Sequence, residues 1–190
     1  MADALISYLQ LFRSVPEQDR QLITSAFKKL DLKEGDTLFY SGKICREMFF
    51  VCDGVLRILV NTEDGRQVTH YFLKENQFCT ILNSFNNQVP ADEGIQAACD
   101  ALVLSIGRDT LLRLYQQIPY LKELIDSITQ QALLDKIRIR NAYLGQDATT
   151  QYKLFLIQQP DIATRVPISD IASYLGITPQ SLSRIRKSIR

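Results

Sequence analysis

Histidine is nearly absent from this chain, and its cysteines are not paired in sequence. Among 190 residues there is one histidine, His70, and there are four cysteines without a Cys-x-x-Cys pair: Cys45, Cys52, Cys79 and Cys99. Zinc and iron–sulfur sites usually need closer pairs, and most acid–base mechanisms need histidine. The sequence shows no nucleophile–base pair and no phosphate-binding loop. We therefore expect no enzyme activity, metal or cofactor, reduced and mostly buried thiols, and a strand position for His70.

Long apolar runs are missing as well. No run approaches the roughly 18 residues that a membrane span needs, and the N-terminus has no signal pattern, so we expect a cytoplasmic protein without membrane contact.

The net charge is only +1 but is unevenly distributed along the chain. From residue 162 onward there are one acid and five bases: Asp170, and Arg165, Arg184, Arg186, Lys187 and Arg190. Such a basic end on a neutral body is expected where one end meets a polyanion.

Residues 166–190 have the pattern of two short helices around a tight turn. Ser169 is placed to cap the first helix, and Gly176 to end it in the left-handed conformation. Thr178 is placed to cap the second, with Pro179 at the first helical position, where its missing N–H costs nothing. On the second helix Leu182, Ile185 and Ile189 line one face, and Gln180, Ser181, Arg184 and Lys187 line the other. This pattern predicts a helix-turn-helix with an outward-facing recognition helix.

The outward side chains of the second helix suit base edges and phosphates. Arg184 can donate two parallel hydrogen bonds to guanine, and Gln180 can pair with adenine in the same way. Hydroxyl and basic side chains, with the backbone amides at the helix start, can hold phosphates. The sequence thus predicts double-stranded DNA as a partner, with contacts from Ser169, Thr178, Gln180, Ser181, Arg184, Arg186 and Lys187. An ordinary surface hairpin with a solvated basic face is the alternative.

Strand and turn patterns fill the middle of the chain, and helical patterns flank them. The expected strands are 37–40, 48–52, 55–60, 67–73, 95–98 and 102–106. Several short strands with glycine-bearing turns indicate a barrel or a double-sheet roll. The expected helices are 2–12, 14–30 (opened by a Ser14–Glu17 capping box), 109–117, 119–144, and one from Asp147 or Thr149 through Ile157 to a stop at Pro160.

The helix expected at 119–144 carries two apolar stripes. A helix that packs on one core needs only one stripe. Two stripes predict two partners, the strand region on one side and the same helix of a second chain on the other. We assign this homodimer contact to Leu121, Leu124, Ile125, Ile128, Ala132 and Ile139. A helix buried more deeply within a single chain is the alternative.

Three segments together have a specific pattern. Residues 33–42 open on Lys-Glu-Gly-Asp, residues 48–57 are an apolar strand with a glycine turn, and residues 171–184 hold the helix-turn-helix. In this order they resemble the Crp/Fnr family of bacterial transcription regulators. The resemblance covers essentially the whole chain.

The resemblance implies an α+β fold with three parts. These are a cyclic-nucleotide-binding-like β-roll (a double-stranded β-helix) in residues 1–118, a dimerisation helix in 119–145, and a winged-helix-type helix-turn-helix in 146–190. It further implies a homodimeric, sequence-specific DNA-binding regulator with a small-molecule effector in the roll, and RNA polymerase as a further partner. Signals in the roll would tilt the dimer helix and change the spacing of the recognition helices.

The segment that matches the family's nucleotide cassette departs from its pattern. Members that bind cyclic nucleotides carry the sequence Phe-Gly-Glu-Leu, followed by Arg-Ser or Arg-Thr. The glutamate accepts a hydrogen bond from the ribose hydroxyl, and the arginine neutralises the cyclic phosphate. Here Thr80 replaces the glycine and Ile81 the glutamate, while Ala91 and Asp92 stand at the arginine and hydroxyl positions. Because losing a charge-assisted hydrogen bond costs about 1.5–3 kcal/mol, we expect cyclic AMP to bind weakly or not at all. The degenerate effector pocket is assigned to Phe78, Cys79, Thr80, Ile81, Leu82, Ala91 and Asp92.

The residues leave further alternatives open. The pocket could take an apolar or cationic ligand instead, or be vestigial. Cys79 could act as a thiol sensor, although the sequence shows no resolving cysteine. The C-terminal helices could bind a protein rather than DNA, since the basic charge is modest and Pro179 stands where the family often has arginine.

Overall fold

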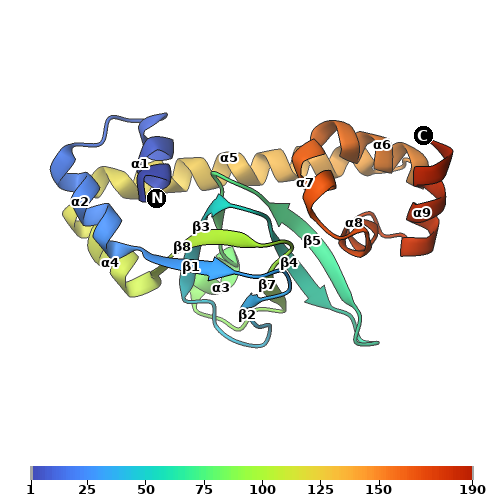
Figure 1. Cartoon of the computed structure of the whole chain (residues 1–190). Coiled ribbons are helices and arrows are strands. Elements are labelled where there is room, and N and C mark those ends of the chain that lie inside the picture. The colour runs from blue at the N-terminus through green and yellow to red at the C-terminus, as the bar shows by residue number, and fades with distance from the viewer. Residues whose placement is uncertain (1, 190) are drawn as a thin grey trace.

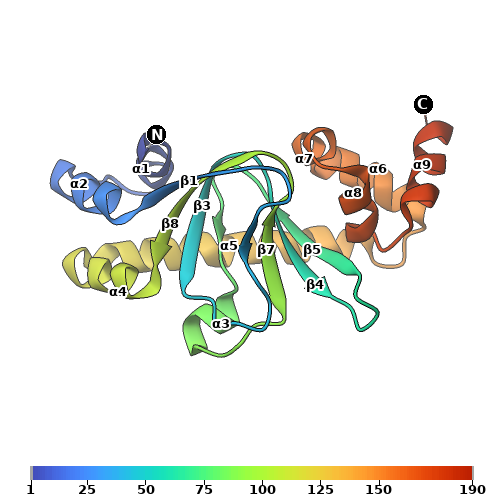
Figure 2. The ribbon, with the colours of Figure 1, turned by 60° about the horizontal axis from the view of Figure 1, so that its bottom comes forward.

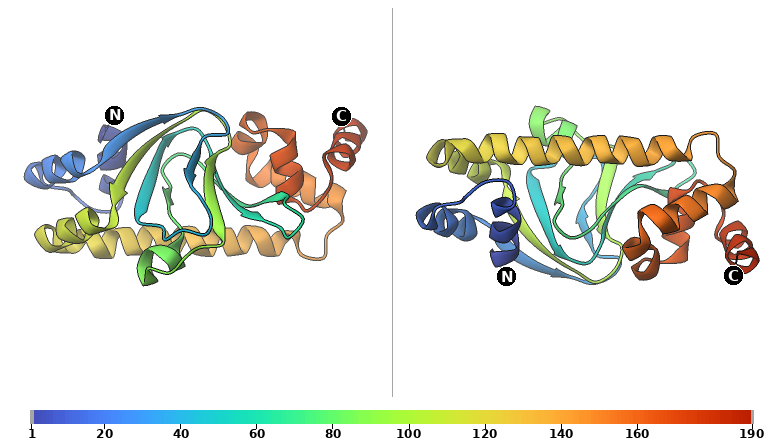
Figure 3. Two further views of the ribbon diagram at one scale, coloured as in Figure 1. Left: turned by 90° about the horizontal axis from the view of Figure 1, so that it is seen from below. Right: turned by 90° about the horizontal axis from the view of Figure 1, so that it is seen from above.

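One long helix, α5 (Pro119–Tyr143), runs along most of the molecule (Figure 1). The computed structural model describes residues 2–189. The strands lie against the middle of α5, with the N-terminal helices near one of its ends and the C-terminal helices near the other (Figure 3). The expected helix at 119–144 is therefore present, and Pro119 occupies its first turn.

Eight strands form two antiparallel sheets, which we call the roll. The sheet orders are β1-β8-β3-β6 and β2-β7-β4-β5. The strands are β1 (Lys28–Leu32), β2 (Thr37–Phe39), β3 (Glu47–Asp53), β4 (Leu56–Asn61), β5 (Gln67–Leu73), β6 (Phe78–Cys79), β7 (Glu93–Ala97) and β8 (Ala101–Gly107). Side chains of both sheets meet in one core, which includes Phe49, Leu56, Leu73, Ile95 and Val103. The predicted roll is thus confirmed.

The turn between β3 and β4 requires glycine. Gly54 has a φ of +91°, and a Cβ there would lie 2.4 Å from the carbonyl oxygen of Asp100. Only a residue without a side chain fits that approach in that conformation.

Helices cover the roll at its two ends (Figure 2). At one end α1 (Ala2–Gln10), α2 (Glu17–Ala26), α4 (Arg108–Gln117) and the first turns of α5 share a core with β3 and β8. At the other end lie α6 (Ala148–Gln158), α7 (Pro160–Arg165), α8 (Ile168–Tyr174) and α9 (Pro179–Ser188). Their core reaches into the roll through Val55 and Phe72. All regular structure described in residues 146–189 is helical, so the strands of a wing are not among it.

The sequence patterns misplaced several short elements. The helix expected through Leu30 ends at Ala26, because Lys28–Leu32 pairs with β8 as a strand. The Ser14–Glu17 capping box does not form; Pro16 holds the cap position and no side chain caps the helix. Strand β6, helix α3 (Leu82–Asn87) and helix α7 were not predicted, since two to six residues show no clear period. Pro160 does not simply end a helix but begins α7.

Candidate nucleic-acid interface and roll interior

The α8–α9 pair forms by the local chemistry that its sequence predicts. Gly176 ends the turn with a φ of +69°. The hydroxyl oxygen of Thr178 accepts the backbone N–H of Ser181 at 3.1 Å and caps α9, with Pro179 at the first position. Leu182 is fully buried and anchors α9 to its neighbours. The predicted cap at Ser169 is wrong, because α8 begins one residue earlier, at Ile168, with Pro167 at its cap.

Except for Ser169, the residues predicted to contact DNA lie on α9 or in the turn that precedes it. Gln180 and Arg184 are exposed and one helical turn apart on α9. Arg184, Arg186 and Lys187 form no ion pair with any residue from 2 to 189, so their charges are available to phosphates. Thr178 is exposed and Ser181 half-buried, both in capping contacts. Ser169 lies on α8, exposed.

Helix α8 is docked on strands β4 and β5 of the roll. Arg57 Nη1 donates to Asp170 Oδ1 at 2.6 Å, and both side chains are nearly buried. Beside this pair, the backbone N–H of Thr69 donates to Ser173 Oγ at 2.9 Å. A hollow of about 700 Å³ separates the β4–β5 hairpin from the α8–α9 turn. The recognition helix is therefore held at a fixed place relative to the roll.

The cassette segment fills the interior of the roll instead of lining a large cavity. Phe78 through Ile81 are buried, as is Ala91, whereas Leu82 is partly exposed and Asp92 exposed. Thr80 donates through its hydroxyl to the carbonyl oxygen of Glu47 at 2.8 Å. The hollow beside Phe78 and Thr80 measures about 30 Å³. Leu82 also borders an open hollow of about 500 Å³ between α3, α4 and α5. A site for a drug-sized ligand occupies about 300–1,000 Å³, so the hollow beside Phe78 and Thr80 is too small for a nucleotide.

Cys79 is poorly suited to thiol chemistry in this fold. Its side chain is 1% exposed, and burial raises its pKa to about 12. Since the thiolate is the reactive form, the buried thiol stays protonated at neutral pH. His70 lies in β5 as expected, half-buried, and burial lowers its pKa.

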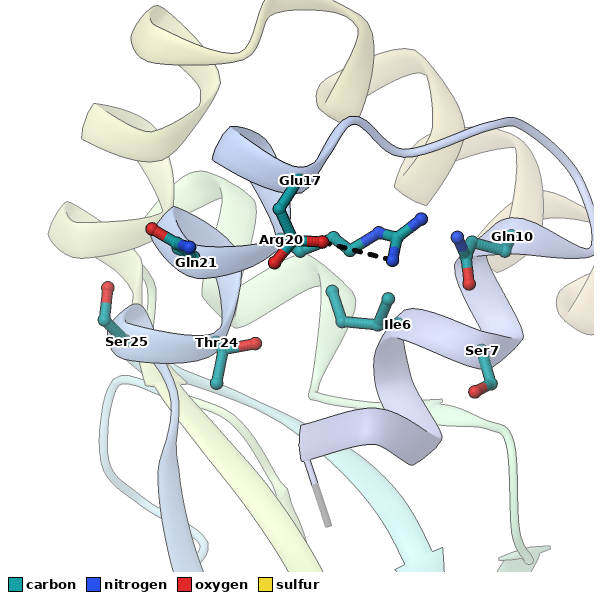
Figure 4. Close-up of a pocket in the computed structure, with 8 residues that line it drawn as sticks. All are labelled: Ile6, Ser7, Gln10, Glu17, Arg20, Gln21, Thr24 and Ser25. Carbon is teal, nitrogen blue, oxygen red and sulfur yellow. Dashed lines mark hydrogen bonds and ion pairs between the residues drawn. The ribbon is translucent and has the colours of Figure 1, made fainter.

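A shallow hollow between α1 and α2 is shown in Figure 4. Its one basic group is already engaged, because Arg20 donates from Nε to the carbonyl oxygen of Val15 at 2.9 Å and from Nη1 to Glu17 at 3.3 Å. No charge is left there to recognise a ligand.

Comparison with known proteins agrees with this architecture. The profile of the cyclic nucleotide-binding domain family matches residues 29–118. The chain is 25% identical over 170 residues to Vfr, the cAMP-activated global transcriptional regulator of Pseudomonas aeruginosa, covering 80% of this chain and 78% of Vfr. Its fold is similar to a Crp/Fnr family protein from Eubacterium rectale, with a TM-score of 0.67, 18% identity, and coverage of 96% and 87% of the two chains. Residues 29–118 are therefore similar to the cyclic nucleotide-binding domain family, and the chain as a whole has the fold of a Crp/Fnr family protein.

The likeness in fold extends to other solved structures. The c-di-GMP responsive global regulator CLP of Xanthomonas campestris superposes with a TM-score of 0.71 at 14% identity, covering 92% of this chain and 91% of CLP. FixK2 from Bradyrhizobium japonicum has the same TM-score at 16% identity, covering 86% of this chain and 84% of that one.

The dimer contact that we assigned from the sequence needs correction. Leu121, Leu124, Ile125 and Ile128 are at most 9% exposed, because they pack in the core formed with α1, α2, α4 and the roll. Ala132 and Ile139 are half-buried and line a cavity beside the roll. The stripe of α5 that the chain leaves uncovered consists of Leu133, Leu134 and Ile137, which are 42%, 49% and 45% exposed.

Two polar residues of the site escaped the sequence analysis. Arg57 interrupts an apolar strand, which is the one local signal of its buried ion pair. Lys136 extends from α5 toward the roll, with its Nζ 5.2 Å from the ring centre of Tyr71.

None of the helices in residues 2–189 has the length and apolarity to span a membrane.

Proposed function

We propose that this protein is a sequence-specific DNA-binding transcription regulator of the Crp/Fnr type that acts as a homodimer. The observation that carries the proposal is the exposed face of α9, where Gln180 and Arg184 stand one turn apart over a buried Leu182. An amide and a guanidinium so placed match the edges of adenine and guanine. Vfr and CLP, to which this chain is similar, are both described as global regulators, and this supports the same function.

The phosphate contacts would come from the C-terminal end of α9. Arg186 and Lys187 are exposed and free of carboxylate partners within residues 2–189. Such contacts position a recognition helix without reading sequence. They also release counterions, so the affinity should fall steeply with salt.

The homodimer would form through the outer stripe of α5. Leu133, Leu134 and Ile137 give that stripe an apolar character along about one and a half helical turns. Pairing two copies of α5 would cover it and bring two recognition helices to one duplex. The expected half-site spacing is about 34 Å, one turn of DNA.

The effector of this regulator would not be cyclic AMP. The filled cassette and the missing arginine both support that part of the proposal. We also propose the division into a sensor roll (1–118), a dimerisation helix (119–145) and a DNA-binding unit (146–190), with RNA polymerase as a further partner.

Selection from a pool of random duplexes tests the function. The full chain should enrich an inverted repeat with half-sites about 10 base pairs apart. Its affinity for that duplex should fall at least tenfold between 50 and about 200 mM salt. If the selection enriches no common sequence, or if the affinity does not change with salt concentration, the proposal is overturned. A protein partner for the C-terminal helices would then be favoured.

A further inference from the structure

A small cavity lies where the three parts of the chain meet. It measures about 100 Å³. Strand β5 contributes Tyr71 and Phe72 to its wall, α5 contributes Ala132 and Lys136, and the C-terminal helices contribute Gln159 and Tyr174. It is separate from the 30 Å³ hollow at the cassette, although Lys136 borders both. A molecule in this cavity would touch the roll, the long helix and the helix-turn-helix unit together.

Lys136 is the unusual member of this wall. Six lysine or arginine residues within 2–189 are at least partly buried. Five of them donate to a carboxylate or a carbonyl oxygen: Arg20, Arg57, Lys74, Arg108 and Arg165. Lys136 has no such partner among the described residues; its ammonium group lies over the face of Tyr71. A partly desolvated ammonium group normally has hydrogen-bonded or charged partners. Lys136 thus makes none of the hydrogen bonds that such a group normally makes within residues 2–189.

The nearest acid in sequence does not fill this role. Asp135 also borders the cavity, but its Oδ1 accepts from Gln131 at 3.2 Å and from Arg138 at 3.1 Å. Lys74, another wall residue, is paired with Asp161 at 2.5 Å. Burial lowers the pKa of Lys136, which agrees with the lack of a counter-charge.

Further donors face the same space. The amide nitrogen of Gln159 donates to the hydroxyl of Tyr143 at 3.2 Å and lies 3.5 Å from the hydroxyl of Tyr174. The Tyr174 hydroxyl carries a proton that is available to an acceptor in the cavity. Both N–H groups of the Gln159 amide are thus engaged, and they hold the Tyr174 phenol in place. An ammonium and a phenol beside about 100 Å³ suit a compact acceptor with several oxygens.

We propose that this cavity binds a small inorganic oxyanion of phosphate or sulfate size, with Lys136 as its counter-charge. The volume is several-fold below the roughly 300–1,000 Å³ of sites for drug-sized ligands, so a nucleotide is excluded. Because the anion contacts β5, α5 and α8, its binding stabilises the docked position of the helix-turn-helix unit. That regulatory consequence rests on the proposed function, whereas the binding itself does not.

The test uses the full chain with inorganic phosphate and sulfate as probes, at an ionic strength held constant with sodium chloride. Isothermal titration should show saturable binding of at least one of the two anions, and the melting temperature should rise with its concentration. Cyclic AMP should not displace the bound anion. Constant ionic strength separates a site from general screening.

The decisive variant is Lys136→Met, which keeps an unbranched apolar side chain and removes the charge. We expect at least a tenfold loss of oxyanion affinity and, in anion-free buffer, a melting temperature equal to or above that of the wild type, because an unpaired cation is gone. Lys153→Met, at an exposed position of α6, is the matched control and should bind as the wild type does. Lys136→Gln serves as a second variant with the same expected loss of affinity.

Several results would overturn the proposal. One is the absence of phosphate and sulfate binding by the wild type, and another is unchanged affinity in both Lys136 variants. A lower melting temperature of Lys136→Met in anion-free buffer would show that the protein already satisfies this lysine. If the chain binds phosphate but does not bind duplex DNA, the oxyanion site is supported and the proposed function is refuted.

Discussion

Arg57 and Asp170 are 113 positions apart in the chain, and their side chains meet at 2.6 Å between the roll and helix α8. Arg57 also donates to Gln96, Thr69 and Gln67, so its guanidinium is satisfied on the roll side without the aspartate. Asp170 depends more on the pair, because it is 13% exposed and Arg57 is its one basic partner among the described residues. This contact joins helix α8 to the roll.

Removing the charge of Asp170 should loosen that contact. A hydrogen bond between charged groups contributes about 1.5–3 kcal/mol, and burial of the carboxylate, which raises the pKa of Asp170, offsets part of it. Asp170→Asn, which keeps a polar side chain, should therefore cost about 1–2 kcal/mol. The measurement is urea unfolding of the full chain. Asp161→Asn is the control, since its pair with Lys74 is exposed and should contribute at most about 1 kcal/mol. Equal effects of the two changes would mean that the Arg57 pair does not hold α8.

The base contact predicted for Arg184 has a specific signature. Arg184→Ala should weaken binding to the selected duplex by about 1–3 kcal/mol and relax the preference at one position of each half-site. Lys187→Ala should instead weaken binding to all duplexes similarly and reduce the salt dependence. Competition binding with single-base variants of the duplex measures both. Arg113→Ala, exposed on α4, is the control and should change neither. An unaltered base preference in Arg184→Ala would remove this residue from the reading face.

Dimerisation should depend on the outer stripe of α5 and not on its inner one. The double change Leu134→Glu with Ile137→Glu places two like charges in the proposed seam and should weaken the dimer at least tenfold, as sedimentation equilibrium can measure. Leu22→Glu, on α2 and 36% exposed, should leave the dimer intact. A wild-type chain that is monomeric at micromolar concentration would contradict the seam itself.

The lowered pKa of Glu75 predicts how the stability of the folded chain depends on pH. Burial alone would raise its pKa, but hydrogen bonds from Arg165 and from backbone N–H groups outweigh burial and hold the pKa at about 2, compared with 4.5 for the free group. The stabilisation is therefore present above pH 4.5 and is lost as pH falls through 2. Its size is on the order of 1–3 kcal/mol for a side chain that is about a quarter exposed.

Glu75→Gln should be less stable than the wild type at pH 7 by that amount, and the two stabilities should converge between pH 4.5 and 2. Chemical unfolding at a series of pH values measures the convergence. Glu63→Gln, in the exposed hairpin, should follow the wild-type curve. A constant difference between Glu75→Gln and the wild type across this range would show that the carboxylate is not what stabilises the contact.

Features that depend on neighbouring residues in sequence were predictable. Thr178, Pro179 and Gly176 specify the start of α9 and the turn before it through hydrogen bonds and backbone conformations that need no distant contact. The hairpin around Gly65 follows the same rule. So does the strand Gln67–Leu73, whose bounds match the prediction. Periodicity also fixed the length of α5 to within one residue.

Contacts between distant segments were decided by the tertiary structure alone. Periodicity shows that α5 has two apolar stripes, but which stripe its own chain covers depends on where α1, α4 and the roll pack, and they cover Leu121 and Ile125. The partner of Arg57 and the missing partner of Lys136 follow from the docking of α8 on β5, which brings together groups that no sequence spacing relates. The sequence by itself thus determined most of the longer elements and the order in which they follow one another. Three-dimensional packing decided which of their surfaces remain free to bind, because burial is a property of the assembled chain.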